Sequence, residues 1–264
     1  MSALLALMLA SFRTEAMHRL QTFVMILGGL VEVFARISIW KAVYGGRADV
    51  DGVSLDQMIA YALIGGTLLS SWDSTAVVRD VGATIRTGAI ASTLLRPASY
   101  PLMLLAQQLG ARLFSMMAVS LPVILVMGLL YGLEAPASVP HGVLFIFYLA
   151  LSTLILMLTG IIVGLLAFWV LDAHALEWLL RGLLAVLSGG LVPLWFFPAG
   201  LAGIAHALPF SWITYQPMAV YLGRLDFGAS LAQLLIGVVW LCILGGIATL
   251  LWSRACRLVV VQGG

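Results

Sequence analysis

Charged residues are scarce in this chain. Of its 264 residues, 9% are Asp, Glu, Lys or Arg and 62% are hydrophobic. A typical soluble domain is about 25% charged and 45–50% apolar. A soluble domain of this size still exposes about a quarter of its unfolded surface, so it could not hide this much apolar surface from water. The composition excludes a cytosolic enzyme, a secreted disulfide scaffold and a disordered tail, and it predicts a protein that dissolves in lipid.

Residues that specific chemistries require are also missing. Lys41 is the only lysine and no GxxxxGK[ST] stretch occurs, so the chain has no phosphate-cradling Walker loop. There is no HExxH or GxSxG motif, the two cysteines lack CxxC spacing, and the four histidines lie in separate segments. The net charge of +2 is too small to indicate a nucleic-acid partner. We expect no catalytic residue, metal site or bound cofactor in this chain, and no enzyme activity of its own.

The sequence does contain long runs without charged residues. Four of them cover 113–133, 135–171, 182–223 and 227–253, and two further apolar stretches precede them. A helix needs about 20 apolar residues to cross roughly 30 Å of hydrocarbon, and these runs are too long for barrel strands. The predicted fold class is all-α and polytopic, with residues 1–264 as a single domain. The six predicted transmembrane helices are 21–44, 57–78, 112–132, 142–171, 175–197 and 230–252.

Two segments do not fit the pattern of a straight span. Residues 1–20 begin apolar and then carry Arg13, Glu15 and Arg19, which predicts an amphipathic helix on the inner membrane surface. No basic region precedes their apolar part, as a signal peptide would require. Residues 193–223 hold four prolines and seven aromatic residues. They are too apolar for a solvated loop and too broken for a span, so we expect an outer re-entrant hairpin.

The distribution of Arg and Lys sets the expected orientation. With the N-terminus inside, the inner segments hold nine arginines: Arg13, Arg19, Arg79, Arg86, Arg96, Arg112, Arg181, Arg254 and Arg257. The outer segments then hold Lys41, Arg47 and Arg224. Because basic residues accumulate on the cytoplasmic side of membrane proteins, we expect both termini in the cytoplasm.

The longest inner connection runs from Arg79 to about Gly110, and its segment 79–101 interleaves Arg, Asp and Thr with Ile, Leu and Ala. This pattern predicts a short amphipathic helix at the membrane surface, which must end before Pro97 because proline disfavours helical backbone at Arg96. The residue types leave two interpretations open. The segment is either an interfacial turn that fixes the topology or a docking element for a cytoplasmic partner.

Residues 88–97 of this connection begin with Gly88 and end with Leu94, Leu95, Arg96 and Pro97. They resemble the G-x-I/L-x-x-x-L-L-R-P stretch that permeases of type-2 ABC exporters carry in this connection. Leu208-Pro209-Phe210, followed by Pro217 and by Tyr221-Leu222-Gly223, is similar to the pattern these permeases carry before their last span. Length, six expected spans, a surface helix and an outer hairpin also match, so the resemblance covers nearly the whole chain.

The resemblance implies a half-transporter in a bacterial inner membrane, in contact with membrane lipid. Two permease chains, identical or related, would join two separate ABC ATPase subunits, which bind ATP and Mg²⁺. The inner loop after the second span would form a coupling helix seated in a cleft of the ATPase. Carried over by position, the coupling residues are Arg79, Asp80, Arg86, Gly88, Leu94, Leu95, Arg96 and Pro97. The cargo is not indicated.

Glu32, Arg36 and Asp73 are charged residues inside the first two predicted spans. Glu32 and Arg36 lie four residues apart on one helix face, so they form either a local ion pair or a polar point on the substrate route or at a permease contact. Asp73 lies about 8 Å from the inner end of its span and is expected to meet Arg79 rather than Arg36. If these charges bind ions or protons, the alternative function is a secondary carrier or channel-like protein.

A last group of charges, Asp172, His174, Glu177 and Arg181, falls at the inner turn between the fourth and fifth predicted spans. We expect a solvated connector there, able at most to form a second, weaker contact with the ATPase.

Overall fold

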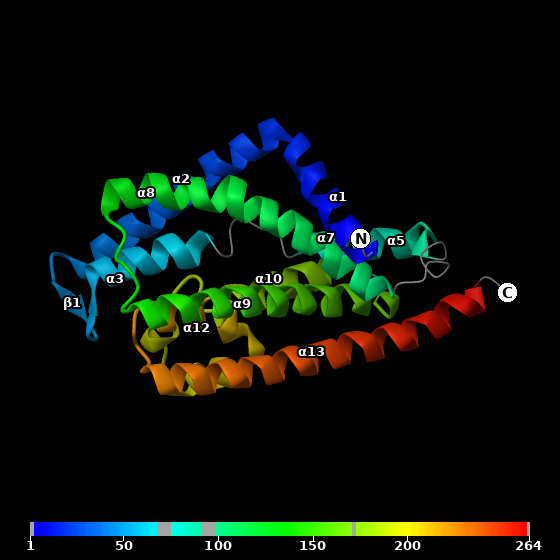
Figure 1. The fold of residues 1–264 in the computed structure, drawn as a ribbon. Coiled ribbons are helices and arrows are strands. Elements are labelled where there is room, and N and C mark those ends of the chain that lie inside the picture. The colour runs from blue at the N-terminus through cyan, green and yellow to red at the C-terminus, as the bar shows by residue number, and fades with distance from the viewer. Residues whose placement is uncertain (1–2, 68–74, 91–98, 171–172, 263–264) are drawn as a thin grey trace.

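A computed structural model describes residues 3–67, 75–90, 99–170 and 173–262 of the chain. Helices make up almost all of this structure, which confirms the predicted all-α class (Figure 1). The elements are α1 (Ala3–Met17), α2 (Arg19–Tyr44), β1 (Asp49–Val50), β2 (Val53–Ser54), α3 (Leu55–Ala60), the π-helical turn η1 (Tyr61–Gly65), α5 (Ala76–Arg86), α7 (Tyr100–Ser115), the π-helical turn η2 (Met116–Ser120), α8 (Leu121–Tyr131), α9 (Val139–Leu165), η3 (Leu166–Phe168), α10 (Ala173–Leu187), η4 (Leu194–Phe196), α11 (Ala199–Ala207), η5 (Pro209–Trp212), α12 (Tyr215–Tyr221) and α13 (Phe227–Gln262).

Within the described residues, four helices are long and apolar enough to cross a membrane: Arg19–Tyr44, Tyr100–Tyr131, Val139–Phe168 and Phe227–Leu258. They coincide with the first, third, fourth and sixth predicted spans. The second and fifth predicted spans are represented by shorter helices, Leu55–Gly65 and the 15-residue α10. The polytopic helical class therefore holds, while the number of six spans remains a prediction.

The predicted start of the third span and the predicted end of the fifth span differ from the structure. The third span was expected to begin at Arg112, but the helix already begins at Tyr100. Arg112 lies inside this helix and is only 1% exposed, so it does not mark a membrane boundary. The fifth was expected to reach 197, but α10 ends at Leu187. Gly189 has a φ of +75°, a conformation that helices exclude and glycine tolerates, so the chain leaves the helix there.

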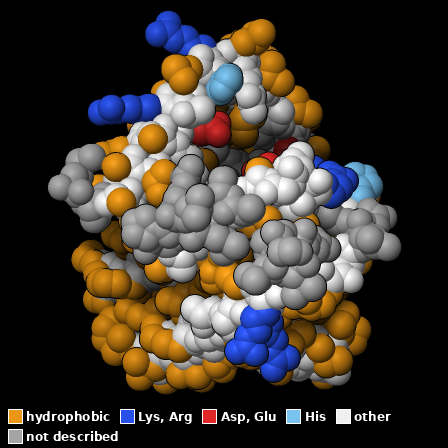
Figure 2. Space-filling view, turned by 90° about the vertical axis from the view of Figure 1, so that its right-hand side faces the viewer, with side chains coloured by type: hydrophobic (Ala, Val, Ile, Leu, Met, Phe, Trp, Pro, Cys, Tyr) orange, Lys and Arg blue, Asp and Glu red, His pale blue; other side chains and the backbone are white. Residues whose placement is uncertain are grey.

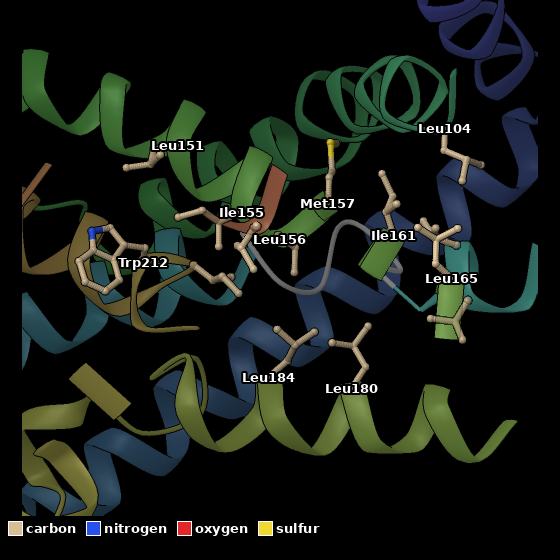
Figure 3. Close-up of a cluster of buried hydrophobic side chains, with 14 of the residues drawn as sticks. Leu104, Leu151, Ile155, Leu156, Met157, Ile161, Leu165, Leu180, Leu184 and Trp212 are labelled. Atoms are coloured by element: carbon tan, nitrogen blue, oxygen red, sulfur yellow. The ribbon is translucent and has the colours of Figure 1, made fainter. Parts of the chain in front are cut away.

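Helix α9 forms the centre of the hydrophobic core. It contacts α13, α5, α12, α10 and α7, and 61% of its most apolar stretch is buried, against 11% for α2 and 17% for α13. Ile155, Met157 and Ile161 of α9 are fully buried, and Leu180 and Leu184 of α10 point toward them (Figure 3). Helices α2 and α13 thus turn long apolar faces outward, as lipid-facing helices do.

A β-hairpin lies at one end of the bundle (Figure 1). Asp49 pairs with Ser54 and Val50 with Val53, so only two residues form the turn. These residues, Asp51 and Gly52, both have positive φ angles, which is the two-residue turn that matches the twist of a hairpin. Ser54 then starts α3, because its hydroxyl and the Gln57 side chain form a reciprocal capping box.

The predicted surface helix 1–20 corresponds to α1 and to a break in the helix at His18. Helix α1 ends at Met17, His18 leaves helical geometry, and α2 begins at Arg19. Helix α1 packs closely on α7, because a Cβ atom at Gly110 would overlap the carbonyl oxygen of Met8. Phe12 and Phe114 stack edge to face beside this contact. The angle between α1 and α2 is therefore held by packing on α7.

Residues 193–223 fold as a series of short helices, η4, α11, η5 and α12, none longer than nine residues. The prolines and aromatic residues that led to the prediction of an irregular segment divide it in this way. Helix α12 packs against α9 and η1, and all its residues except Tyr215 are buried.

Helices α1 and α5 and the end of α13 lie toward one end of the bundle, opposite the hairpin (Figure 1). Viewed from that end, basic side chains project around the molecule and acidic side chains lie between them (Figure 2). This end contains the residues that the sequence predicts to be on the inner side.

Candidate functional site

A buried carboxylate joins α5 to α10 at this end of the bundle. Arg79 Nη1 donates a 2.6 Å hydrogen bond to Glu177 Oε1, and Arg181 Nη2 donates to the same oxygen at 3.2 Å. The hydroxyl of Thr75 donates to it at 3.1 Å and accepts from Arg181 at 3.0 Å. His174 Nδ1 lies 3.6 Å from the second carboxylate oxygen. We call Thr75, Arg79, His174, Glu177 and Arg181 the Glu177 cluster.

Burial distinguishes the members of the Glu177 cluster. The Glu177 side chain is 8% exposed, whereas Arg79 is 46% and Arg181 52% exposed. Hydrogen bonds to a carboxylate are strongest where water is excluded, and a buried carboxylate without cationic partners is costly. The buried acid therefore fixes two arginines that still reach the surface.

Helix α5 is amphipathic, and its apolar face determines where it packs. Val77, Val78 and Val81 are fully buried, whereas Arg79 and Asp80 are exposed. The buried side rests on α9 at Gly164, where a Cβ atom would lie 3.3–3.4 Å from Val81 and the backbone of Val77. A small residue in α9 thus brings α5 close enough for Arg79 to reach α10.

The structure places the first half of the predicted coupling residues. Arg79, Asp80 and Arg86 lie on the exposed side of α5. Gly88 follows in a turn with a φ of +71°, which ends the helix. The rest of the predicted contact, Leu94, Leu95, Arg96 and Pro97, lies outside the described residues.

The second ionic site is the pair of Glu32 and Arg36 within α2. Arg36 donates to Glu32 Oε1 from Nε at 3.1 Å and from Nη2 at 2.8 Å, so the expected i,i+4 pair forms. Arg36 Nη1 also donates a 2.6 Å hydrogen bond to the backbone carbonyl of Gly190. Asp73, the third predicted intramembrane charge, lies outside the described residues.

The carbonyl of Gly190 belongs to the non-helical chain that follows α10. The two preceding backbone carbonyls also accept hydrogen bonds from other parts of the protein. The Tyr61 hydroxyl donates to the carbonyl of Gly189 at 2.8 Å, and the Tyr215 amide donates to the carbonyl of Ser188 at 3.0 Å. Backbone that leaves a helix at membrane depth must find such partners inside the protein. Arg36 therefore stabilises a helix end as well as pairing with Glu32.

Sequence reasoning missed the central role of Glu177 and placed it in a solvated connector. One local signal was available. Glu177 follows Leu176 and precedes Leu180 by three positions, so it borders the apolar stripe by which α10 packs on α9. Its partner Arg79 is 98 residues away in sequence, and no local pattern indicates that contact.

An acidic cavity of about 360 Å³ lies at the hairpin end, where Asp56 of α3 faces Glu134 of the α8–α9 connection. Desolvation and the negative charge of Asp56 raise the pKa of Glu134 above its usual range. Two carboxylates do not make a metal site, and no group of His, Cys, Asp or Glu in the described parts of the chain could hold a metal ion.

These features define a polytopic helical membrane protein in which ionic contacts tie separate helices together. The sequence model of the ABC-2 family transporter protein family matches residues 30–263. The chain belongs to this family, as the GAIASTLLRP stretch predicts. No curated protein and no solved structure matches the chain. Family membership makes it a multi-pass transport subunit, the membrane component of an ABC transporter, and implies an ABC ATPase as its partner.

Proposed function

We propose that this chain is the membrane-spanning half of an ABC exporter in a bacterial inner membrane. ATP would be hydrolysed on separate ATPase subunits, which also bind Mg²⁺, and a second permease chain, identical or related, would complete the pore. The absence of a Walker loop from the sequence supports this division of labour. This chain would then contribute conformational change and no covalent chemistry.

The proposed orientation puts α1, α5 and both termini in or facing the cytoplasm. The excess of arginine in the segments expected inside supports it. In this arrangement α3–η1 and α10 complete six spans, residues 1–20 lie at the inner surface beside lipid, and residues 193–223 form the outer re-entrant part.

One contact carries the proposal for coupling, namely that of Arg79 with the buried Glu177 carboxylate. Helix α5 opens the predicted coupling segment 79–101, and Glu177 belongs to α10. A force applied to the segment by an ATPase would reach α10 through this ion pair and α9 through the contact at Gly164. The Glu177 cluster would thus transmit movement, while residues 88–97 would provide the docking surface.

The geometry of Arg36 disfavours the alternative, a secondary carrier that uses intramembrane charges. Its guanidinium is engaged by Glu32 and by the carbonyl of Gly190, and its side chain is only 17% exposed. An ion-binding or proton-binding site needs a group that can change partners during the cycle. These bonds indicate a structural role for the Glu32–Arg36 pair.

The docking proposal is tested by co-purification of the ATPase from gently solubilised membranes. Replacing Leu94 and Leu95 by serine is expected to reduce the retained ATPase more than about tenfold, because apolar anchors dominate the energy of such contacts. The matched control replaces the leucine pair Leu129–Leu130, which is exposed near the opposite end of the bundle. This control should keep the ATPase. Full retention by the Leu94/Leu95 variant would refute docking at this segment.

A further inference from the structure

A polar cavity of about 380 Å³ lies between α1, α2, α5 and α7. Its polar lining includes Glu15 of α1, Gln21 of α2, Arg79 and Asp80 of α5, and Gln107 and Gln108 of α7. The volume falls in the range of small-molecule sites, about 300–1,000 Å³. Four helices thus surround a polar space near the proposed inner membrane boundary.

The walls of this cavity are fixed by close packing. The contact of α1 with Gly110 of α7 holds α1 in place, and the helix breaks at His18. The chain therefore turns between α1 and α2 (Figure 1). On the α5 side, Arg79 is tied to the buried Glu177. The space is therefore a consequence of how these helices pack.

Several polar side chains of the lining have no protein partner. Within the described parts of the chain, the side chains of Glu15, Gln21, Gln107 and Gln108 make no hydrogen bond. Glutamine is costly to place in a membrane-length helix such as Tyr100–Tyr131, which includes α7, unless its amide is satisfied. These side chains offer three negatively polarised amide oxygens and a carboxylate to whatever fills the cavity.

An apolar groove of about 690 Å³ adjoins the cavity at the start of α2. Gln21 and Met25, one helical turn apart, line both spaces, so the two meet along this edge of α2. Leu20 and Val24 of the groove are 77% and 58% exposed, and Arg19 stands at its end. A polar space that continues into an apolar groove fits an amphipathic molecule.

We propose that the cavity and groove bind a phospholipid whose headgroup carries a primary ammonium. An acyl chain would lie along Leu20 and Val24, the phosphate would meet the guanidinium of Arg19, and the ammonium would donate to Glu15 with Asp80 nearby. Ammonium groups hydrogen-bond carboxylates and amide oxygens, and guanidinium groups bind phosphate. Two carboxylates repel an anionic headgroup, and a quaternary ammonium has no hydrogen to donate.

The test measures lipid retention by the full-length chain, purified in detergent with its associated ATPase. The protein is exchanged into equal amounts of phosphatidylethanolamine, phosphatidylglycerol and phosphatidylcholine, and bound lipid is identified by native mass spectrometry. We expect phosphatidylethanolamine to be retained about tenfold over the other two, as charge-assisted hydrogen bonds of this kind allow. Glu15→Gln should abolish the preference. The measurement needs no nucleotide, so its outcome is independent of the proposed coupling.

Two further variants keep the test decisive. Glu134→Gln removes an acid from the cavity at the opposite end of the bundle and should leave the preference unchanged. Ala111→Leu fills part of the inner cavity without changing charge and should lower retention even if Glu15→Gln does not fold. Equal retention of the three lipids by the unaltered chain, preference for phosphatidylglycerol, or a preference that survives both inner variants would overturn the proposal.

Discussion

Two ion pairs among the described residues, Glu32–Arg36 and Glu177–Arg181, each join a glutamate to an arginine four positions later in the same helix. In the first pair the arginine is the more buried partner, with 17% of its side chain exposed against 38% for the acid. In the second the acid is buried, with 8% exposed against 52% for the arginine. The same i,i+4 spacing thus gives two different sites, because the surroundings decide which charge loses water.

This difference in burial explains what each site ties together. A buried arginine has five donors and reaches beyond its own helix, so Arg36 bonds the carbonyl of Gly190. A buried carboxylate accepts several donors, so Glu177 collects Arg79 and Arg181. The first site stabilises a helix end, and the second joins the helix that opens the predicted coupling segment to α10. The predictions below test this distinction.

The largest effect is expected from Arg79→Ala combined with Arg181→Ala. The double variant leaves the buried Glu177 carboxylate with Thr75 and, at longer range, His174. Breaking a buried ion pair costs about 3–5 kcal/mol, and the half-exposed arginines place the expected loss at the lower end, about 3 kcal/mol. The midpoint of thermal unfolding in detergent should fall by roughly 6–12 °C.

The control for this variant is Arg86→Ala, which removes an exposed arginine of the same helix and should change the midpoint little. If the double variant and the unaltered chain unfold at the same midpoint temperature, Glu177 does not hold α5. That result would also refute the proposal that the Glu177 cluster transmits movement.

An intermediate effect is expected from Arg36→Met, which has a similar volume and no charge. It leaves the carbonyl of Gly190 without its donor and removes the partner of Glu32. An unsatisfied buried carbonyl costs about 1–3 kcal/mol, so we expect a loss of about 2 kcal/mol in unfolding free energy. Arg36→Lys keeps the charge but has one ammonium in place of a branched guanidinium, and it should recover only part of this loss. Complete recovery by lysine would show that charge alone matters there.

The sequence predicted those parts of the molecule that depend on neighbouring residues. Helix α2 begins and ends within two residues of the predicted span, because an apolar run ends at Gly45, which adopts the left-handed cap conformation. The Glu32–Arg36 pair followed from its spacing, and the family followed from the GAIASTLLRP stretch. The prolines of 193–223 indicated a broken segment, and it consists of short helices.

Contacts between distant residues could not be predicted in the same way. Arg79 meets Glu177 because α5 packs at Gly164 of α9, and Arg36 meets Gly190 because α10 ends early. Arg112 resembled a boundary charge and is buried within a helix. In each case tertiary packing decides whether a charge is solvated, and hydropathy along the chain does not contain that information. The contacts predicted for Asp73 and for residues 94–97 remain predictions, since these residues lie outside the described part of the chain.

The smallest effect is expected from Glu32→Gln. The glutamine oxygen still accepts a hydrogen bond from Arg36, and Arg36 keeps the carbonyl of Gly190, so the guanidinium retains partners. The substitution therefore removes one charge of the pair but leaves the hydrogen-bond partners of Arg36 in place. The unfolding midpoint should therefore shift far less than in Arg36→Met. A shift as large as that of Arg36→Met would show that Glu32 orients Arg36 toward Gly190, and the two glutamate–arginine pairs would then depend on their acids equally.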